Sequence, residues 1–216
     1  GVLSSALCMD KVSAKKIFER MGLPTARYKL VYAEDVKDDL ESVVKEVEAE
    51  LPYTLFVKPS NMGSSVGISK VRNTEELRAA LALAGKYDRR IIIEEGINCR
   101  EVETGVIGNH KPEVAAVGEI VAKLDFYDYT AKYTDDAGTE LSIPAKLPAS
   151  TYEEIRTLAK KAYMALDCSG FARIDFFVDK DTGQVYINEI NTIPGFTKYS
   201  MFPLMWKEAG VSFREL

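Results

Sequence analysis

Two short segments near the C-terminal end contain side chains suited to phosphate chemistry. Arg173 and Asp175 alternate along one predicted strand, and Glu189 and Asn191 alternate along the next. Alternate residues of a strand share a face, and the turn-forming run at 180–183 makes the two strands a hairpin. Carboxylate and amide oxygens suit Mg²⁺, and a guanidinium stabilises a developing oxyanion or a phosphoryl group. The alternative is an exposed hairpin held by salt bridges.

A loop of small residues follows a predicted strand that ends in Lys58. The loop, residues 58–67, contains two glycines and three serines, among them Ser64 and Ser65. Glycine allows backbone N–H groups to approach phosphate oxygens, and the ammonium of Lys58 would add positive charge there. Because the lysine precedes the glycines, the loop is not a P-loop. The alternative is an ordinary surface turn.

An apolar run at 91–93 predicts a buried strand that ends in Glu94 and Glu95. Backbone groups just past such a strand, as far as Ile97, can pair with the edge of an adenine ring. Glu101 follows closely enough to accept hydrogen bonds from ribose hydroxyls. The alternative is a strand that leaves the core into charged residues.

Two later loops contain further candidates. Aromatic residues from Phe126 onward lie in a predicted mobile loop, residues 123–150, where they could exclude water while Lys132 contacts phosphate. After the hairpin, Gly195 would let backbone amides approach a tetrahedral oxyanion. Ser200, at the start of a predicted helix, could bind a carboxylate or could serve only as an N-cap.

Composition excludes several other kinds of protein. A chain of 216 residues with a formal charge of −5 suits one or two compact lobes and argues against nucleic acid or anionic membrane as partner. No apolar run is long enough to cross a bilayer. Three scattered cysteines indicate reduced thiols in a cytoplasm. A single histidine, His110 in a predicted loop, argues against a catalytic triad.

Periodicity and turn residues predict the elements that position these groups. Helices are expected at 10–21, 35–50, 74–84, 151–166 and 201–209, with Thr74 as the N-cap of the helix at 74–84. Strands are expected at 54–58, 68–71, 91–94, 102–108 and 113–122 and in the hairpin, residues 172–191. Strands that alternate with helices and hairpins indicate an α+β fold with two lobes, at 1–93 and 94–216.

These motifs resemble, in the same order along the chain, those of the D-alanine–D-alanine ligases, which belong to the ATP-grasp superfamily. The motifs are Met9-Asp10-Lys11, Val57-Lys58-Pro59 with 63–67, 127–133, Arg173-Ile174-Asp175, and 188–192 with Pro194-Gly195. The resemblance covers essentially the whole chain. It implies a two-lobed ATP-grasp fold with a nucleotide cleft between antiparallel sheets. It also implies a cytoplasmic ligase that uses ATP and two Mg²⁺ or Mn²⁺ ions to join two D-alanines, through an acyl phosphate, for peptidoglycan synthesis.

The resemblance also implies a role for each matching residue. Nucleotide contacts fall to Lys11, Lys58, Ser65, Glu94, Glu95, Ile97, Glu101, Phe126 and Lys132. The metal ligands are Asp175, Glu189 and Asn191. Arg173 and the backbone of Gly195 form the oxyanion site, while Ser64 and Tyr133 order the mobile loop. Ser200 and the backbone amide of Met201 hold the carboxylate of the second substrate.

The chain departs from the family's pattern in lacking an N-terminal α/β domain, and it also stops within the family's last helix. We therefore expect a fragment of an enzyme that is a homodimer when full length. The alternatives are a D-alanine–D-serine or D-alanine–D-lactate ligase, another ATP-grasp carboxylate–amine ligase, and a nucleotide-binding fragment without turnover. The run that ends in Tyr133 favours D-alanine as the acceptor.

Overall fold

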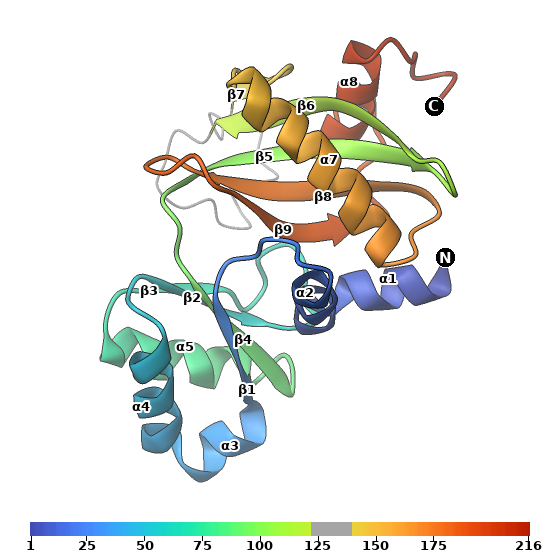
Figure 1. The fold of residues 1–216 in the computed structure, drawn as a ribbon. Coiled ribbons are helices and arrows are strands. Elements are labelled where there is room, and N and C mark those ends of the chain that lie inside the picture. The colour runs from blue at the N-terminus through green and yellow to red at the C-terminus, as the bar shows by residue number, and fades with distance from the viewer. Residues whose placement is uncertain (122–139) are drawn as a thin grey trace. The chain divides into compact units, whose positions relative to one another are not determined.

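The computed structural model describes residues 1–121 and 140–216, which form two compact units (Figure 1). Unit 1 comprises Gly1–Cys8, Ala14–Thr25 and Asn98–Leu216, and unit 2 comprises Met9–Ser13 and Ala26–Ile97. This grouping differs from the sequence-based division at 93/94, because two N-terminal segments pack with the C-terminal residues. Among the described residues, no helix is long and apolar enough to cross a membrane.

Unit 2 is an antiparallel sheet covered by helices. Its strand order is β1-β4-β2-β3, with β1 at Tyr28–Tyr32, β4 at Arg90–Glu95, β2 at Leu55–Pro59 and β3 at Ser69–Val71. The helices are α3 at Ala33–Asp38, α4 at Leu40–Glu50 and α5 at Thr74–Ala84. Leu55, Val57, Ile91 and Ile93 are fully buried in one cluster with apolar residues of all three helices. The predicted strands and the predicted helix at 74–84 are confirmed, whereas β1 was not predicted.

Local capping corrects two details of the sequence prediction. The helix predicted at 35–50 is two helices, because Asp39 accepts a hydrogen bond at 3.0 Å from the N–H of Ser42 and starts α4 there. The cap of α5 is Asn73, whose Oδ1 accepts from the N–H of Glu76 at 2.9 Å, and not Thr74 as expected.

Unit 1 contains a five-stranded antiparallel sheet and most of the remaining helices. The strand order is β7-β6-β5-β8-β9, with β7 at Glu140–Ser142, β6 at Glu113–Val121, β5 at Cys99–Gly108, β8 at Gly170–Asp179 and β9 at Val185–Asn191. The helices are α1 at Val2–Met9, α2 at Lys11–Arg20, whose residues 11–13 belong to unit 2, α7 at Ala149–Ala165 and α8 at Met201–Glu208. The two antiparallel sheets confirm the α+β prediction. Neither α1 nor β7 was predicted, and both β7 and the start of α7 fall within the expected loop 123–150.

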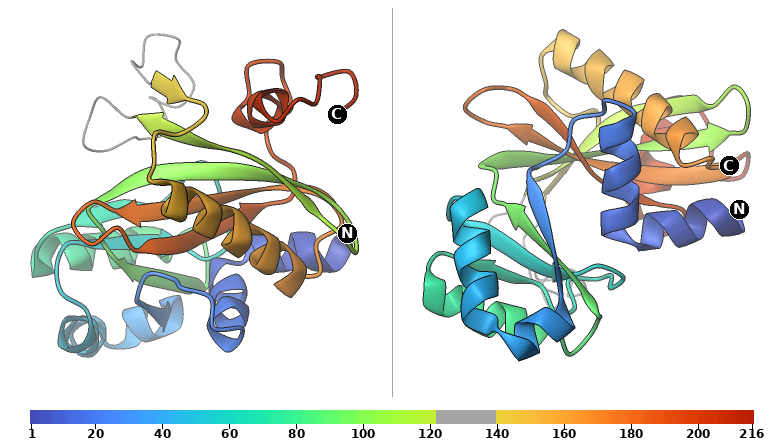
Figure 2. Two further views of the ribbon diagram at one scale, coloured as in Figure 1. Left: turned by 45° about the horizontal axis from the view of Figure 1, so that its top comes forward. Right: turned by 60° about the horizontal axis from the view of Figure 1, so that its bottom comes forward.

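The two faces of this sheet have different partners (Figure 2). Helix α7 packs on the face that presents Val102, Ala172, Ile174 and Phe176, within the largest apolar cluster of unit 1. Helix α8 lies against the other face, where Phe202 and Trp206 form part of a separate cluster. The odd-numbered residues of β8 point to this second face, because the even-numbered ones are buried under α7.

A glycine allows α8 to approach β5 closely. A Cβ atom at Gly105 would lie 2.7 Å from Nε1 of Trp206 and 3.0 Å from Cε2 of Phe202. We expect Gly105→Ala to lower the free energy of unfolding by about 1–3 kcal/mol, because the rings must shift to admit the methyl group. Chemical denaturation measures this effect. Gly63→Ala is the control, since a Cβ there meets nothing within 4 Å, and equal stability of the two variants would refute the packing argument.

Candidate active site

Polar side chains of unit 1 occupy paired positions on three neighbouring strands. Glu103 of β5 pairs with Asp175 of β8, which in turn pairs with Glu189 of β9. Two residues earlier on β8, Arg173 pairs with Asn191. Directly paired residues of antiparallel strands point to one face, with Cβ atoms about 4.5–5.5 Å apart. The structure therefore brings together the four predicted residues of the hairpin and adds Glu103, which the sequence prediction did not include.

A β-bulge directs Glu189 and Asn191 to this face. Asp175 pairs with Glu189 but Phe176 pairs with Ile187, so Asn188 is an extra residue in β9. Without the bulge, strict alternation from Val185 and Ile187 would place both polar side chains in the core under α7. The burial pattern shows where the alternation breaks. Val185, Ile187 and Ile190 are buried, while the residues between them are partly exposed, so the step between buried residues changes from two to three.

Arg173 lies between two carboxylates. Its Nε donates to Oδ1 of Asp175 at 2.7 Å, and its Nη2 donates to Oδ2 of the same residue, also at 2.7 Å. The same Nε is 2.7 Å from Oε2 of Glu103. Two parallel bonds to one carboxylate fix the plane of the guanidinium, so Arg173 is oriented before any ligand binds.

The electrostatics of this group follow from burial and from charge. Burial raises the pKa of the Glu103 carboxyl well above its usual range, the Asp175 carboxylate raises it further, and Arg173 opposes both. For Arg173, burial disfavours the charged form, but the carboxylates of Asp175 and Glu103 outweigh burial and raise the pKa. The guanidinium therefore stays charged, and it can face an anion at any physiological pH.

The chemistry of the donor set fits a hard divalent cation. Asp175 and Glu189 offer carboxylate oxygens on paired positions, and Asn191 offers an amide oxygen. A buried oxygen, Oε1 of Glu103, has no hydrogen-bond partner among the described residues. Arg173 holds both oxygens of Asp175, and in the part of the chain that the structure describes no three acidic, histidine or cysteine side chains are arranged to hold a metal ion. A cation at Asp175 would therefore compete with Arg173, and the metal site stays a prediction.

The loop after β9 brings Gly195 and Ser200 together. The Ser200 hydroxyl oxygen accepts from the N–H of Thr197 at 3.1 Å, and a Cβ atom at Gly195 would lie 3.0 Å from that oxygen. A side chain at position 195 would therefore need the Ser200 hydroxyl to shift by a few tenths of an ångström. The Ser200 hydroxyl forms no cap bond to α8, which argues against the N-cap alternative. Met201 buries its side chain with Phe202, so that its backbone is the part available to a ligand.

In unit 2, the two predicted phosphate-binding lysines lie at the same loop. The ammonium of Lys58 forms an ion pair with the carboxylate of Glu94, and both side chains are buried. Lys11 donates from Nζ to the carbonyl oxygen of Met62 at 2.6 Å. Each ammonium is thus held beside residues 58–67, which is the segment expected to surround phosphates.

The backbone of this loop is strained. Ser64 and Ser65 have φ angles of 52° and 61°, in the left-handed region that costs a non-glycine residue roughly 1–2 kcal/mol. Gly67 has a φ of 72°, and a Cβ there would lie 2.7 Å from Cδ2 of Tyr87. Strain of this kind is concentrated at ligand-binding sites, which favours a binding loop over the alternative of an ordinary turn.

The remaining predicted nucleotide residues belong to different parts of the chain. In unit 2, the N–H of Glu95 donates to the carbonyl oxygen of Arg27 at 2.9 Å, so this amide is already used, and Ile97 ends the unit. Glu101 is an exposed residue of β5 in unit 1 and pairs with Phe177. The predicted residues Phe126, Lys132 and Tyr133 lie outside the described residues.

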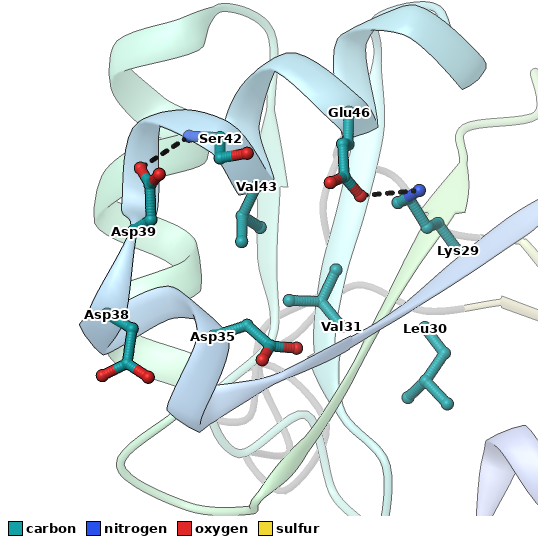
Figure 3. A pocket seen from close by; sticks show the side chains of 9 residues that line it. All are labelled: Lys29, Leu30, Val31, Asp35, Asp38, Asp39, Ser42, Val43 and Glu46. Carbon is teal, nitrogen blue, oxygen red and sulfur yellow. Dashed lines mark hydrogen bonds and ion pairs between the residues drawn. The ribbon is translucent and has the colours of Figure 1, made fainter.

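A cavity of about 340 Å³ in unit 2 is lined by none of the predicted site residues that the structure describes (Figure 3). It lies between β1, α3 and α4, and carboxylates of Asp35, Asp38, Asp39 and Glu46 line it. The single lysine there, Lys29, is paired with Glu46 at 3.4 Å. This excess of negative charge would repel phosphates, so we do not assign the cavity to nucleotide.

The comparisons with known proteins all identify the same family. The family model described as "D-ala D-ala ligase C-terminus" matches residues 17–216. Curated D-alanine–D-alanine ligases are similar over the whole chain, with 55% identity for the protein of Thermoanaerobacter sp. strain X514 and 55% for that of Bacillus velezensis. The chain spans 60% of the length of each of these relatives.

Two solved structures also align with nearly the whole of this chain. The VanG D-Ala:D-Ser ligase from Enterococcus faecalis is 42% identical with a TM-score of 0.88, over 99% of this chain and 60% of the other. The D-alanine-D-alanine ligase from Coxiella burnetii is 32% identical with a TM-score of 0.85, over 100% of this chain and 56% of the other.

Proposed function

The chain belongs to the D-alanine–D-alanine ligase family, in the region of its C-terminal domain, and from that premise we propose that the full-length protein joins two D-alanines at the expense of ATP. By full-length protein we mean this chain together with the further residues that its relatives possess. The observation that supports the proposal most strongly is the paired placement of Arg173, Asp175, Glu189 and Asn191 on one face of a sheet. The test is formation of ADP, phosphate and D-alanyl-D-alanine from ATP and D-alanine.

The proposed reaction has two chemical steps. The carboxylate of the first D-alanine attacks the γ-phosphorus of ATP, and an acyl phosphate and ADP result. The amine of the second D-alanine, after losing a proton, attacks the acyl carbon through a tetrahedral intermediate, and phosphate leaves. Such chemistry depends on positioning and on neutralised charge and needs no nucleophilic side chain, which agrees with the single histidine in the sequence.

Each unit would supply a distinct part of this chemistry. In unit 2, Lys11, Lys58 and the backbone and serines of 58–67 would bind the phosphates, with Ser64 also ordering the mobile loop. Glu94, Glu95 and Ile97 would border the adenine, and in unit 1 Glu101 would bind the ribose. Arg173 and the backbone at Gly195 would stabilise the oxyanion, and Ser200 with the amide of Met201 would hold the carboxylate of the second substrate. Phe126, Lys132 and Tyr133 keep the roles that the family resemblance implies.

Asp175, Glu189 and Asn191 would hold two Mg²⁺ ions, or Mn²⁺ in their place. A bound cation of this kind supplies neutralisation of the charge that develops on the phosphates. The oxygen ligands of the site and the buried acceptor on Glu103 support this assignment.

A second candidate acceptor is D-serine, because a D-Ala:D-Ser ligase is 42% identical to this chain. We retain D-alanine, which the curated relatives at 55% identity are named for. Incubation of the full-length protein with ATP, D-alanine and an equal concentration of D-serine decides between the two acceptors. A predominance of D-alanyl-D-serine would overturn our choice without affecting the proposed chemistry.

Binding of nucleotide tests the role of Lys58. Mg-ADP should raise the melting temperature of the full-length protein, because a ligand selective for the folded state stabilises it, by about 2.7 kcal/mol at a hundred times its Kd. In Lys58→Ala the ligand-induced shift should shrink markedly. The variant also leaves Glu94 buried without its ion pair, so the ligand-free variant will be less stable than the wild type. The quantity compared is therefore the rise in melting temperature on adding Mg-ADP, and not the melting temperature of the ligand-free protein.

Lys45→Ala is the matched control for this experiment, since Lys45 is an exposed lysine on α4 of the same unit. Its shift with Mg-ADP should equal that of the wild type. A full shift in Lys58→Ala would remove Lys58 from the nucleotide site.

A further inference from the structure

Glu103 is a buried acid that neither the sequence prediction nor the proposed reaction uses. Its exposed fraction is 2%, and it lies on β5 at the position paired with Asp175 of β8. Acidic side chains are rarely buried so completely unless they are paired. The partner is Arg173, whose Nε is 2.7 Å from Oε2 of Glu103.

Asp175 has two functions that conflict in the structure. Arg173 holds both of its oxygens, yet Asp175 is also a proposed ligand of the divalent cation. A cation that takes one or both oxygens weakens the bidentate contact between Asp175 and the guanidinium. Glu103 contacts the same Nε from a second strand, so Arg173 keeps a carboxyl partner when Asp175 is engaged elsewhere.

We propose that Glu103 is a positioning residue of the ligase reaction: it retains the Arg173 guanidinium beside the site when Asp175 binds the divalent cation. The proposal rests on the proposed function. Without Glu103, Asp175 is the remaining carboxylate that the described residues place in direct contact with Arg173, and the guanidinium competes fully with the cation for it. Loss of Glu103 should therefore weaken cation binding as well as catalysis, although Glu103 is not itself a proposed ligand.

The test uses Glu103→Gln and Glu103→Ala in the full-length protein. Calorimetric titration of Mn²⁺ into ADP-saturated protein should show affinity reduced by about 10–100-fold in Glu103→Ala, the usual effect of removing a partner of a metal ligand. The kcat should fall by a similar factor while the KM for ATP stays unchanged. Glu103→Gln, of the same shape, keeps a hydrogen-bond acceptor for Nε but no charge, so its losses should be smaller.

Glu119→Gln is the matched control. Glu119 is a buried acid on the neighbouring strand β6, paired with Arg100 at 2.6 Å, and its register partner Val102 belongs to the core under α7. This control should lose stability like the Glu103 variants but keep the wild-type Mn²⁺ affinity and kcat.

Two outcomes would overturn the proposal, and they are distinguishable. If the wild type forms dipeptide while the folded Glu103 variants keep its Mn²⁺ affinity and kcat, the positioning role is wrong and the proposed function stands. If the wild type forms no ligation product, the proposed function fails and this role fails with it. Should Glu103→Ala not fold, the isosteric Glu103→Gln decides, because any retained defect in Mn²⁺ affinity supports the proposal and wild-type affinity refutes it.

Discussion

We expect Glu189→Gln to lower the kcat of the full-length ligase by about 10³-fold. The substitution keeps the shape of the side chain and removes one negative charge opposite Asp175. A metal ion supplies several kcal/mol of transition-state stabilisation, and each ~1.4 kcal/mol corresponds to a factor of ten in rate. The rate of ADP release at saturating ATP and D-alanine is the measurement.

The control for this variant is Glu113→Gln, an exposed acid at the start of β6 in the same sheet. It should keep the wild-type rate, and both variants should unfold at similar temperatures. A Glu189→Gln enzyme with normal turnover would remove Glu189 from the metal site.

The second large effect concerns Arg173. We expect Arg173→Lys to lower kcat by about 10²–10³-fold, the usual cost of removing one donor from an oxyanion site. Lysine keeps the positive charge, but it cannot reproduce the parallel bonds from Nε and Nη2 to Asp175. The loss should appear in kcat with little change in the KM for ATP, because Arg173 acts on the charge that develops during the reaction. Steady-state kinetics measures both quantities.

Arg214→Lys provides the comparison, since Arg214 is an exposed arginine near the end of the chain. It should behave as the wild type. Equal kcat in Arg173→Lys and Arg214→Lys would show that charge alone suffices at position 173, and the oxyanion assignment would have to be withdrawn.

Much of the site could be predicted because it lies on one hairpin. Arg173, Asp175, Glu189 and Asn191 are neighbours in sequence or across a short turn, so alternation groups Arg173 with Asp175 on one strand and Glu189 with Asn191 on the next. The helix Thr74–Ala84 could also be predicted from the sequence. Its apolar residues Leu77, Ala80, Leu81 and Ala84 follow the helical period, and all of them are buried in the structure.

The direction in which β9 faces was not predictable from simple alternation. A two-residue period that starts from Val185 and Ile187 places the Glu189 side chain in the core. The bulge at Asn188 turns that side chain to the opposite face of the sheet. The signal in the sequence is the three-residue step from Ile187 to Ile190, which breaks the apolar alternation.

Glu103 was missed for a different reason. A glutamate is ordinarily exposed, and the burial of Glu103 follows from pairing between β5 and β8, whose residues are far apart in sequence. Pairing of this kind depends on the register of the whole sheet. The N-terminal helix α1 was missed because its packing with the C-terminal residues of unit 1 is likewise distant in sequence.

The most direct test of the central claim follows oxygen atoms from the substrate to the products. D-alanine with ¹⁸O at both carboxylate oxygens is supplied as both substrates, together with ATP and the full-length protein. In the proposed reaction one carboxylate oxygen becomes the bridge of the acyl phosphate and leaves with phosphate. Mass spectrometry should therefore find one ¹⁸O in each inorganic phosphate, one in the amide of D-alanyl-D-alanine, and the unchanged label of the second D-alanine in the C-terminal carboxylate of the dipeptide. Dipeptide formation with unlabelled phosphate would contradict the acyl-phosphate mechanism, and absence of both products would contradict the assignment as a ligase.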